Sequence, residues 1–188
     1  MASMHAVDGL TPELQLSLEQ FYFYEARLLD DRQFKSWLQL IDPAISYTVP
    51  SRVNVMVDNR DRDTESMLAV DRELEGAGSM GCPVSEETFI HLTLRVDRAY
   101  KINAWAEQPP ARTRRIIGNV TCSNDEAGVL DVVSNFHLSL CRPGSESCTY
   151  SGQRRDQLRR IDGGFRILRR DVILDYALIE TPTMGLFF

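Results

Sequence analysis

The sequence is poor in the residues and motifs on which most catalytic sites depend. It contains 3 histidines, at positions 5, 91 and 137, and it has neither a Gly-rich phosphate loop nor a G-x-S-x-G nucleophile turn. An iron–sulfur cluster with mixed ligands takes two cysteines and two histidines, and a non-haem iron site takes two histidines and a carboxylate. The spacing of histidine and cysteine supplies neither set. We therefore expect no metal or cofactor in this chain.

Long apolar runs and paired cysteines are also missing. No apolar run approaches the roughly 20 residues that a membrane helix needs, and residues 1–10 lack the basic start and apolar stretch of a signal peptide. The 4 cysteines form no Cys-x-x-Cys pair, which predicts reduced thiols. These features predict a cytoplasmic protein with no membrane partner.

Lysine is scarce, because only Lys35 and Lys101 are lysine among 21 basic residues. Arginine suits partly buried ion pairs and interfaces, although a codon bias would explain the same skew. The region from Arg154 to Arg170 is rich in arginine, but Asp156 and Asp162 interrupt it. This pattern favours arginine–carboxylate pairing between strands or across an interface, and it argues against a nucleic-acid partner.

The first half of the chain has helical patterns. Thr11-Pro12-Glu13 is a helix start, and the spacing of apolar residues predicts a helix to about Leu29. We expect Asp30 or Asp31 to cap a second, shorter helix that ends at Asp42-Pro43, before a strand over Ile45–Val49.

The polar residues of the first half are assigned to loops and to one further helix start. Residues 1–10 are predicted to be a flexible tail, and residues 57–84 a long polar loop in which Met67, Leu68 and Val70 add a short helical turn. Ser85-Glu86-Glu87 is expected to cap a third helix that runs to Asp97 or Tyr100.

The second half, after Pro109-Pro110, has strand patterns. Apolar residues occupy the even positions of residues 130–140, so one face of that strand should be buried. Asp162-Gly163-Gly164 predicts a hairpin turn, and a change of apolar parity in the next strand predicts a bulge near Arg169-Arg170. Helices followed by three or four antiparallel strands indicate one α+β domain over residues 11–188, with the helices on the concave face of a strongly curved sheet.

Four segments resemble the small (β) subunits of bacterial aromatic-ring-hydroxylating dioxygenases. They are Leu18–Asp30 (LEQFYFYEARLLD), Trp105–Arg114 (WAEQPPARTR), Arg154–Arg160 (RRDQLRR) and the terminal pair Phe187-Phe188. They occur in the same order as in that family, and the resemblance extends from about Leu14 to Phe188. The loop at 57–84 matches least well, because it is longer than usual.

The resemblance implies a cone-shaped α+β fold, like that of nuclear transport factor two and scytalone dehydratase. It also implies a non-catalytic partner for a large α subunit, which would hold the Rieske [2Fe–2S] cluster and the mononuclear iron. Three α and three β subunits would form a hexamer. As residues of the subunit interfaces we predict Trp105, Arg112, Arg114, Arg115, Arg155, Phe187 and Phe188.

The alternative is a free-standing dehydratase or isomerase of the same fold. Such an enzyme would use an internal pocket of tyrosine, histidine and aspartate, for which the candidates are Tyr22, Tyr24, Asp30, His91 and His137. A neighbouring gene that encodes a Rieske-type α subunit would distinguish the two possibilities.

Overall fold

The computed structural model describes residues 11–56, 60, 62–76, 81–101, 109–126, 128–144, 147–177 and 185–188, without the side chains of 123–126. The helices are α1 (Pro12–Asp30), α2 (Phe34–Trp37) and α3 (Phe89–Ala99), with 3-10 turns η1 (Leu38–Leu40), η3 (Glu65–Leu68) and η4 (Val70–Glu73). The strands are β1 (Ile41–Val49), β2 (Ser51–Arg52), β3 (Leu74–Glu75), β4 (Ser85–Glu87), β5 (Arg112–Glu126), β6 (Val129–Cys141), β7 (Cys148–Ile161) and β8 (Gly164–Leu174). The predicted α+β class is confirmed.

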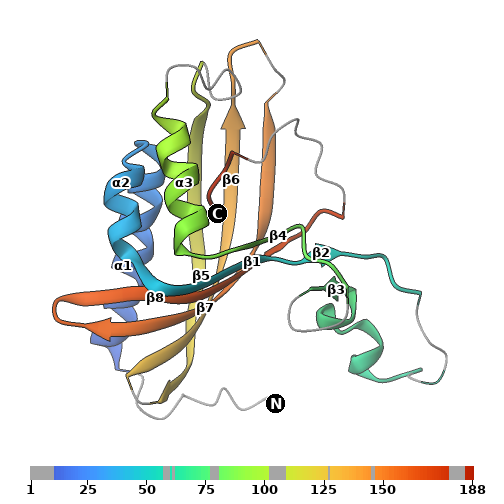
Figure 1. Ribbon diagram of the computed structural model, residues 1–188. Coiled ribbons are helices and arrows are strands. Elements are labelled where there is room, and N and C mark those ends of the chain that lie inside the picture. Colours follow the sequence, from blue (N-terminus) through green and yellow to red (C-terminus); the bar gives the residue numbers. More distant parts are fainter. Residues whose placement is uncertain are drawn as a thin grey trace.

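A six-stranded sheet in the order β4-β1-β8-β7-β6-β5 forms the body of the domain. Every neighbouring pair is antiparallel except β1 and β8, which run parallel. The sheet is strongly curved, and the three helices cover one of its faces (Figure 1). A curved sheet capped by helices leaves an interior that side chains from both layers must fill.

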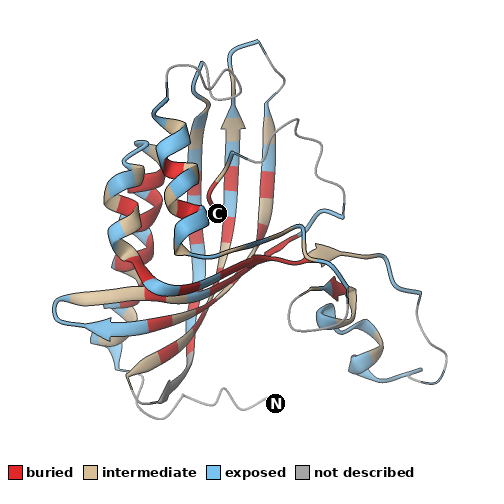
Figure 2. Cartoon of the chain, in the orientation of Figure 1, coloured by how far each residue is buried: buried red, intermediate tan, exposed pale blue. Residues whose placement is uncertain are grey.

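The core lies between the helices and the inner face of the sheet, where the buried residues gather in Figure 2. On β6 the buried residues are Leu130, Val132, Ser134, Phe136 and Leu138, which confirms the predicted alternation. On α1 the buried face includes Leu18, Tyr22 and Leu29, which recur at helical spacing. The predicted helix over residues 12–29 is therefore also confirmed.

The predicted change of parity in the last long strand is present. Leu158 pairs with Ile167, but the next pair joins Gln157 to Arg169, so Leu168 is an extra residue in β8. The bulge therefore lies just before the predicted position. Because of it, Ile167 and Arg170 both point into the core although their numbers differ in parity.

Three local predictions in the first half are wrong. The second helix begins after Gln33, which makes no side-chain cap, and Asp30 and Asp31 lie at the end of α1 instead. Asp42-Pro43 lies inside β1 rather than at a helix end. Ser85–Glu87 is a strand paired with β1, and the N-cap of α3 is Thr88.

A small second unit projects to one side of the sheet. It consists of the two-stranded sheet β2-β3 with η3 and η4 (Figure 1). The two 3-10 turns contain Met67, Leu68 and Val70, so the predicted helical turn is confirmed. The predicted flexible tail at 1–10 lies outside the described residues.

Candidate functional site

The interior of the cone contains a network of buried charges. Arg170 from β8 donates to both carboxylate oxygens of Glu25 on α1 at 2.6 and 3.1 Å, and to both of Asp156 on β7 at 2.9 and 2.7 Å. Arg154 from β7 donates to Glu25 at 3.2 Å, and Glu25, Arg154 and Arg170 are fully buried. The pairing of Asp156 with Arg170 is the cross-strand ion pair that the sequence predicts.

Neutral side chains complete this network. The hydroxyl of Tyr22 donates to Asp156 at 2.8 Å, and the indole nitrogen of Trp37 donates to Glu25 at 3.0 Å. Buried ionised groups are tolerated only when their hydrogen bonds are satisfied. The two arginines and two carboxylates hold one another through several hydrogen bonds, so they form a structural unit. A proton has little freedom to move within it.

The protonation behaviour of the network agrees with a structural role. Burial alone raises the pKa of Glu25, but the charges of Arg170 and Arg154 outweigh it and lower that pKa to about 2. Burial, followed by the charge of Asp156, raises the pKa of Tyr22 well above its usual range. Glu25 therefore stays ionised and Tyr22 stays neutral near pH 7, so neither is suited to general acid–base catalysis.

The terminal residues Phe187 and Phe188 lie inside the cone beside this network. Phe187 and Phe188 are buried, and their rings contact those of Trp37 (4.6 Å between centroids for Phe187) and Phe136 (5.8 Å for Phe188). The main-chain oxygen of Phe188 accepts from Arg170 at 3.0 Å and from the Tyr47 hydroxyl at 3.0 Å. The terminal segment therefore contacts an arginine of β8 through its main chain.

The five residues proposed for an internal catalytic pocket do not meet. Tyr22 lies in the cone, but Tyr24 is 51% exposed and His137 is exposed on the outer side of β6. Asp30 binds Arg115 and Thr113, and the ring nitrogen Nδ1 of His91 accepts from the Thr88 main chain as part of the α3 cap. These positions do not support the dehydratase or isomerase alternative.

The predicted interface residues fall into three environments. Arg112 and Arg114 are exposed on β5, whereas Arg115 is buried and bound to Asp30 at 2.5 Å. Arg155, on the outer face of β7, pairs with Asp71 at 2.7 Å. Phe187 and Phe188 are buried within their own chain, and Trp105 lies outside the described residues. For all seven, a place in a subunit interface stays a prediction.

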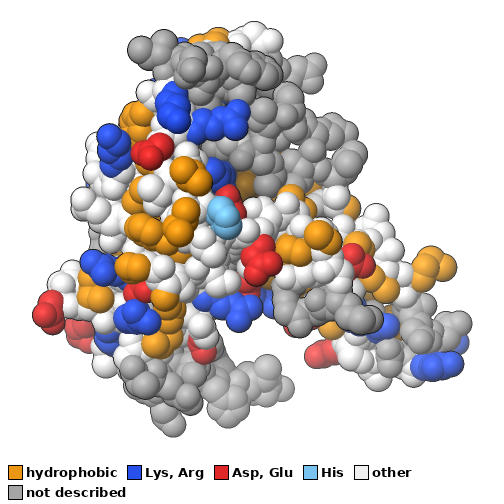
Figure 3. Space-filling view, viewed as in Figure 1, with side chains coloured by type: hydrophobic (Ala, Val, Ile, Leu, Met, Phe, Trp, Pro, Cys, Tyr) orange, Lys and Arg blue, Asp and Glu red, His pale blue; other side chains and the backbone are white. Residues whose placement is uncertain are grey.

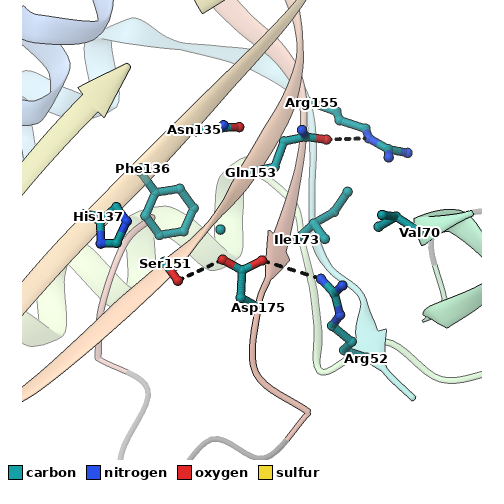
Figure 4. Close-up of a pocket in the computed structure, with 11 residues that line it drawn as sticks. Arg52, Val70, Asn135, Phe136, His137, Ser151, Gln153, Arg155, Ile173 and Asp175 are labelled. Atoms are coloured by element: carbon teal, nitrogen blue, oxygen red, sulfur yellow. Dashed lines mark hydrogen bonds and ion pairs between the residues drawn. The ribbon is translucent and has the colours of Figure 1, made fainter. Parts of the chain in front are cut away.

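A hollow of about 330 Å³ lies on the outer face of the sheet, between β6–β8 and the small unit (Figure 4). Three of its polar residues pair with one another, because Asp175 accepts from Ser151 at 2.8 Å and lies 3.6 Å from Arg52. Phe136, which belongs to the core, closes its floor. Sequence reasoning missed this hollow because it joins two units that are far apart in the chain.

The described residues contain no group of three or more His, Cys, Asp or Glu that could hold a metal ion. In the same part of the chain, no helix is long and apolar enough to cross a membrane. The buried network was also missed, although charged residues at 154 and 156 share the parity of buried Leu158 and so carried a signal for it.

Comparison with known proteins gives one family and several solved structures. The family model described as "Ring hydroxylating beta subunit" matches residues 24–181. A naphthalene 1,2-dioxygenase solved with indole in its active site is similar with a TM-score of 0.77 and 23% identity, over 95% of this chain and 88% of that one. The β subunit of benzoate 1,2-dioxygenase from Burkholderia mallei has a TM-score of 0.62 and 19% identity, over 92% and 93% of the two chains.

The same fold also occurs in an enzyme of another kind. A hexachlorocyclohexane dehydrochlorinase is similar with a TM-score of 0.55 and 11% identity, over 92% of this chain and 95% of that one. At this identity the likeness shows the fold alone. The cone therefore has a fold of the nuclear transport factor two type. Because one fold serves many functions, the residues inside the cone, and not its shape, bear on function.

Proposed function

Because this chain belongs to the family of ring-hydroxylating β subunits, we propose that it is the structural subunit of a terminal oxygenase for aromatic compounds. Beta subunits of this family pair with α subunits. In the proposal, the α subunit holds the Rieske cluster and the mononuclear iron, and three α and three β subunits make the complete particle. A cytoplasmic location stays a prediction.

The observation that carries a non-catalytic role is the set of paired charges and aromatic rings that the described residues bury inside the cone. An enzyme of this shape needs an open cavity with convergent reactive groups. Here the ion pairs of Glu25, Arg154, Asp156 and Arg170 occupy that volume together with Phe187 and Phe188. A cone whose interior is held together in this way is suited to hold another subunit in place.

The outer surface supplies candidate contacts for assembly. β5 is the last strand of the sheet, and its outward side chains include Arg112, Arg114 and Ile116, of which Ile116 is 70% exposed. Figure 3 shows hydrophobic side chains gathered over α3, where Ile90 and Leu94 are exposed. Exposed apolar side chains beside arginines are typical of a protein interface.

Co-expression with a Rieske-type α subunit of the same organism tests the proposal. The two chains should purify together, with a native mass equal to three copies of each. Iron analysis and visible absorption should place the Rieske cluster in the α chain, and the isolated β chain should be colourless. An isolated β chain with a stoichiometric iron–sulfur spectrum, or one that never associates with the α chain, would contradict it.

A further inference from the structure

The last residues of the chain lie inside the cone and are held through their main chain, as a peptide ligand is held by its receptor. Three successive main-chain oxygens each accept a hydrogen bond from a different arginine. They are Leu186 O from Arg95 at 2.5 Å, Phe187 O from Arg115 at 2.5 Å, and Phe188 O from Arg170 at 3.0 Å. Buried main-chain oxygens need hydrogen-bond partners, and here each partner is a charged guanidinium, which makes a stronger contact than a neutral donor does.

Phe188 has the most complete set of contacts. Its ring lies 5.8 Å from that of Phe136 and 6.0 Å from that of Tyr150, in tilted and edge-on arrangements. Its N–H donates to the Tyr47 hydroxyl at 3.0 Å, and the same hydroxyl donates to its main-chain oxygen at 3.0 Å. The surroundings therefore recognise three features together: an aromatic ring, an N–H group and an oxygen that accepts from Arg170.

The interior keeps hydrogen-bonding capacity that the segment leaves unused. Arg154 is fully buried over the ring of Phe136, with its guanidinium carbon 5.3 Å from the ring centroid. Its Nε and Nη2 have no hydrogen-bond partner among the described residues. Buried donors without partners are costly, and a cationic guanidinium binds a carboxylate better than it binds a neutral oxygen.

We propose that the interior of the cone is a binding site for an N-acyl aromatic amino acid or a similar aryl carboxylate, and that Phe188 occupies this site as a ligand supplied by the chain itself. The ring takes the slot beside Phe136 and Tyr150. The acyl N–H donates to Tyr47, and the carboxylate accepts from Arg170 and Tyr47. The proposal is independent of the assembly role, since neither depends on the other.

A tethered ligand has an effective concentration on the order of millimolar or more, so a free ligand competes poorly with it. The experiment therefore uses the full-length Phe188→Ala variant, in which the ring is gone and only the main chain of residue 188 still competes for Tyr47 and Arg170. The probe is N-acetyl-L-phenylalanine, which has the ring, the N–H and the carboxylate. Calorimetric titration should show saturable binding at least tenfold tighter than to the wild-type chain, with a matching rise in melting temperature.

Two control ligands and one control variant separate recognition from mere filling of space. N-acetyl-L-alanine lacks the ring and N-acetyl-L-phenylalaninamide lacks the carboxylate, and each should bind Phe188→Ala at least tenfold more weakly. Phe165→Ala removes a ring that packs on Phe21 at 5.7 Å, away from this site, and it should bind the probe no better than wild type does. Equal binding of the amide, or of the probe by Phe165→Ala, would overturn the proposal.

A second variant keeps the proposal testable if Phe188→Ala folds poorly. Phe188→Leu keeps an apolar side chain, and its affinity for the probe should fall between those of wild type and Phe188→Ala. If Phe188→Ala shows no cooperative melting alone, the probe should restore it. A lack of probe-dependent change in both variants would overturn the proposal.

Discussion

Arg170 Nη1 lies 2.6 Å from Glu25 Oε1, and both side chains are completely buried although the residues are 145 positions apart in the chain. This contact ties the first helix to the last strand. Arg154 also depends on Glu25, through a contact of 3.2 Å. Glu25 therefore pairs with two arginines inside the cone, and Asp156 pairs with one of them as well.

Glu25→Ala should be strongly destabilising, because it leaves two buried cations without this partner. Removal of one member of a buried ion pair costs about 3–5 kcal/mol, which we expect as a loss in the free energy of unfolding measured with urea. Glu13→Ala, in the exposed first turn of the same helix, is the control and should cost much less, because its carboxylate is exposed to solvent. A similar loss in both variants would show that the network contributes no more than a surface charge.

Acid should weaken the same network over a defined range of pH. The pKa of Glu25 is lowered from its ordinary value of 4.5 to about 2, so its contribution to stability is complete above 4.5 and is lost as the pH falls through 2. A shift of this size corresponds to a contribution on the order of 3 kcal/mol. The difference in unfolding free energy between wild type and Glu25→Gln should therefore narrow between pH 4.5 and 2, and a constant difference would contradict the assigned pKa.

Local sequence patterns correctly predicted the helices and strands whose apolar periodicity can be read within their own residues. The alternation of Leu130 to Leu138 and the helical spacing of Leu18 to Leu29 both depend on burial of one face, which the sequence records directly. The predicted class, the four long strands and the bulge in the last of them follow from the same kind of signal. For this reason the sheet half was predicted better than the loops were.

The missed features depend on distant partners. Ser85–Glu87 carries a helix-capping signal, but it pairs as a strand with Tyr47–Val49, and Thr88 caps the helix with His91 instead. Long-range pairing outweighs a local preference of about 1 kcal/mol. The charge network was missed for the same reason, because only the folded sheet brings Arg154 and Arg170 to Glu25.

Gly152 on β7 should tolerate no side chain. A Cβ atom there would lie 2.2 Å from the main-chain oxygen of Ile173 on the neighbouring strand and 3.1 Å from the ring of Phe136. Because a backbone oxygen in a strand cannot move aside easily, Gly152→Ala should lower the free energy of unfolding by about 1–3 kcal/mol.

Gly118 on β5 is the matched control for Gly152, because a Cβ atom there meets nothing within 4 Å. Gly118→Ala should be neutral or stabilising by up to about 1 kcal/mol, since alanine reduces the freedom of the unfolded chain. Thermal or urea unfolding of the two variants gives the comparison. A stable Gly152→Ala chain would mean that β7 and β8 separate more easily than the structure indicates.

The last prediction concerns the arginines at the edge of the sheet. Arg112 and Arg114 are exposed on β5, whereas their neighbour Arg115 is bound to Asp30 inside the chain. Arg115 is therefore a poor test of assembly, because its removal would damage the fold.

In the double variant Arg112→Ala/Arg114→Ala, the isolated chain should keep its melting temperature, since exposed charges contribute little to stability. If the two arginines meet carboxylates of the α subunit, the affinity of the double variant for that subunit should fall at least tenfold. The reason is that a desolvated ion pair that loses one partner costs about 2–5 kcal/mol. Native mass measurement on a dilution series gives the affinity, and Arg62→Ala, an exposed arginine just before η3, is the control. Unchanged assembly of the double variant would place the interface away from this end of β5.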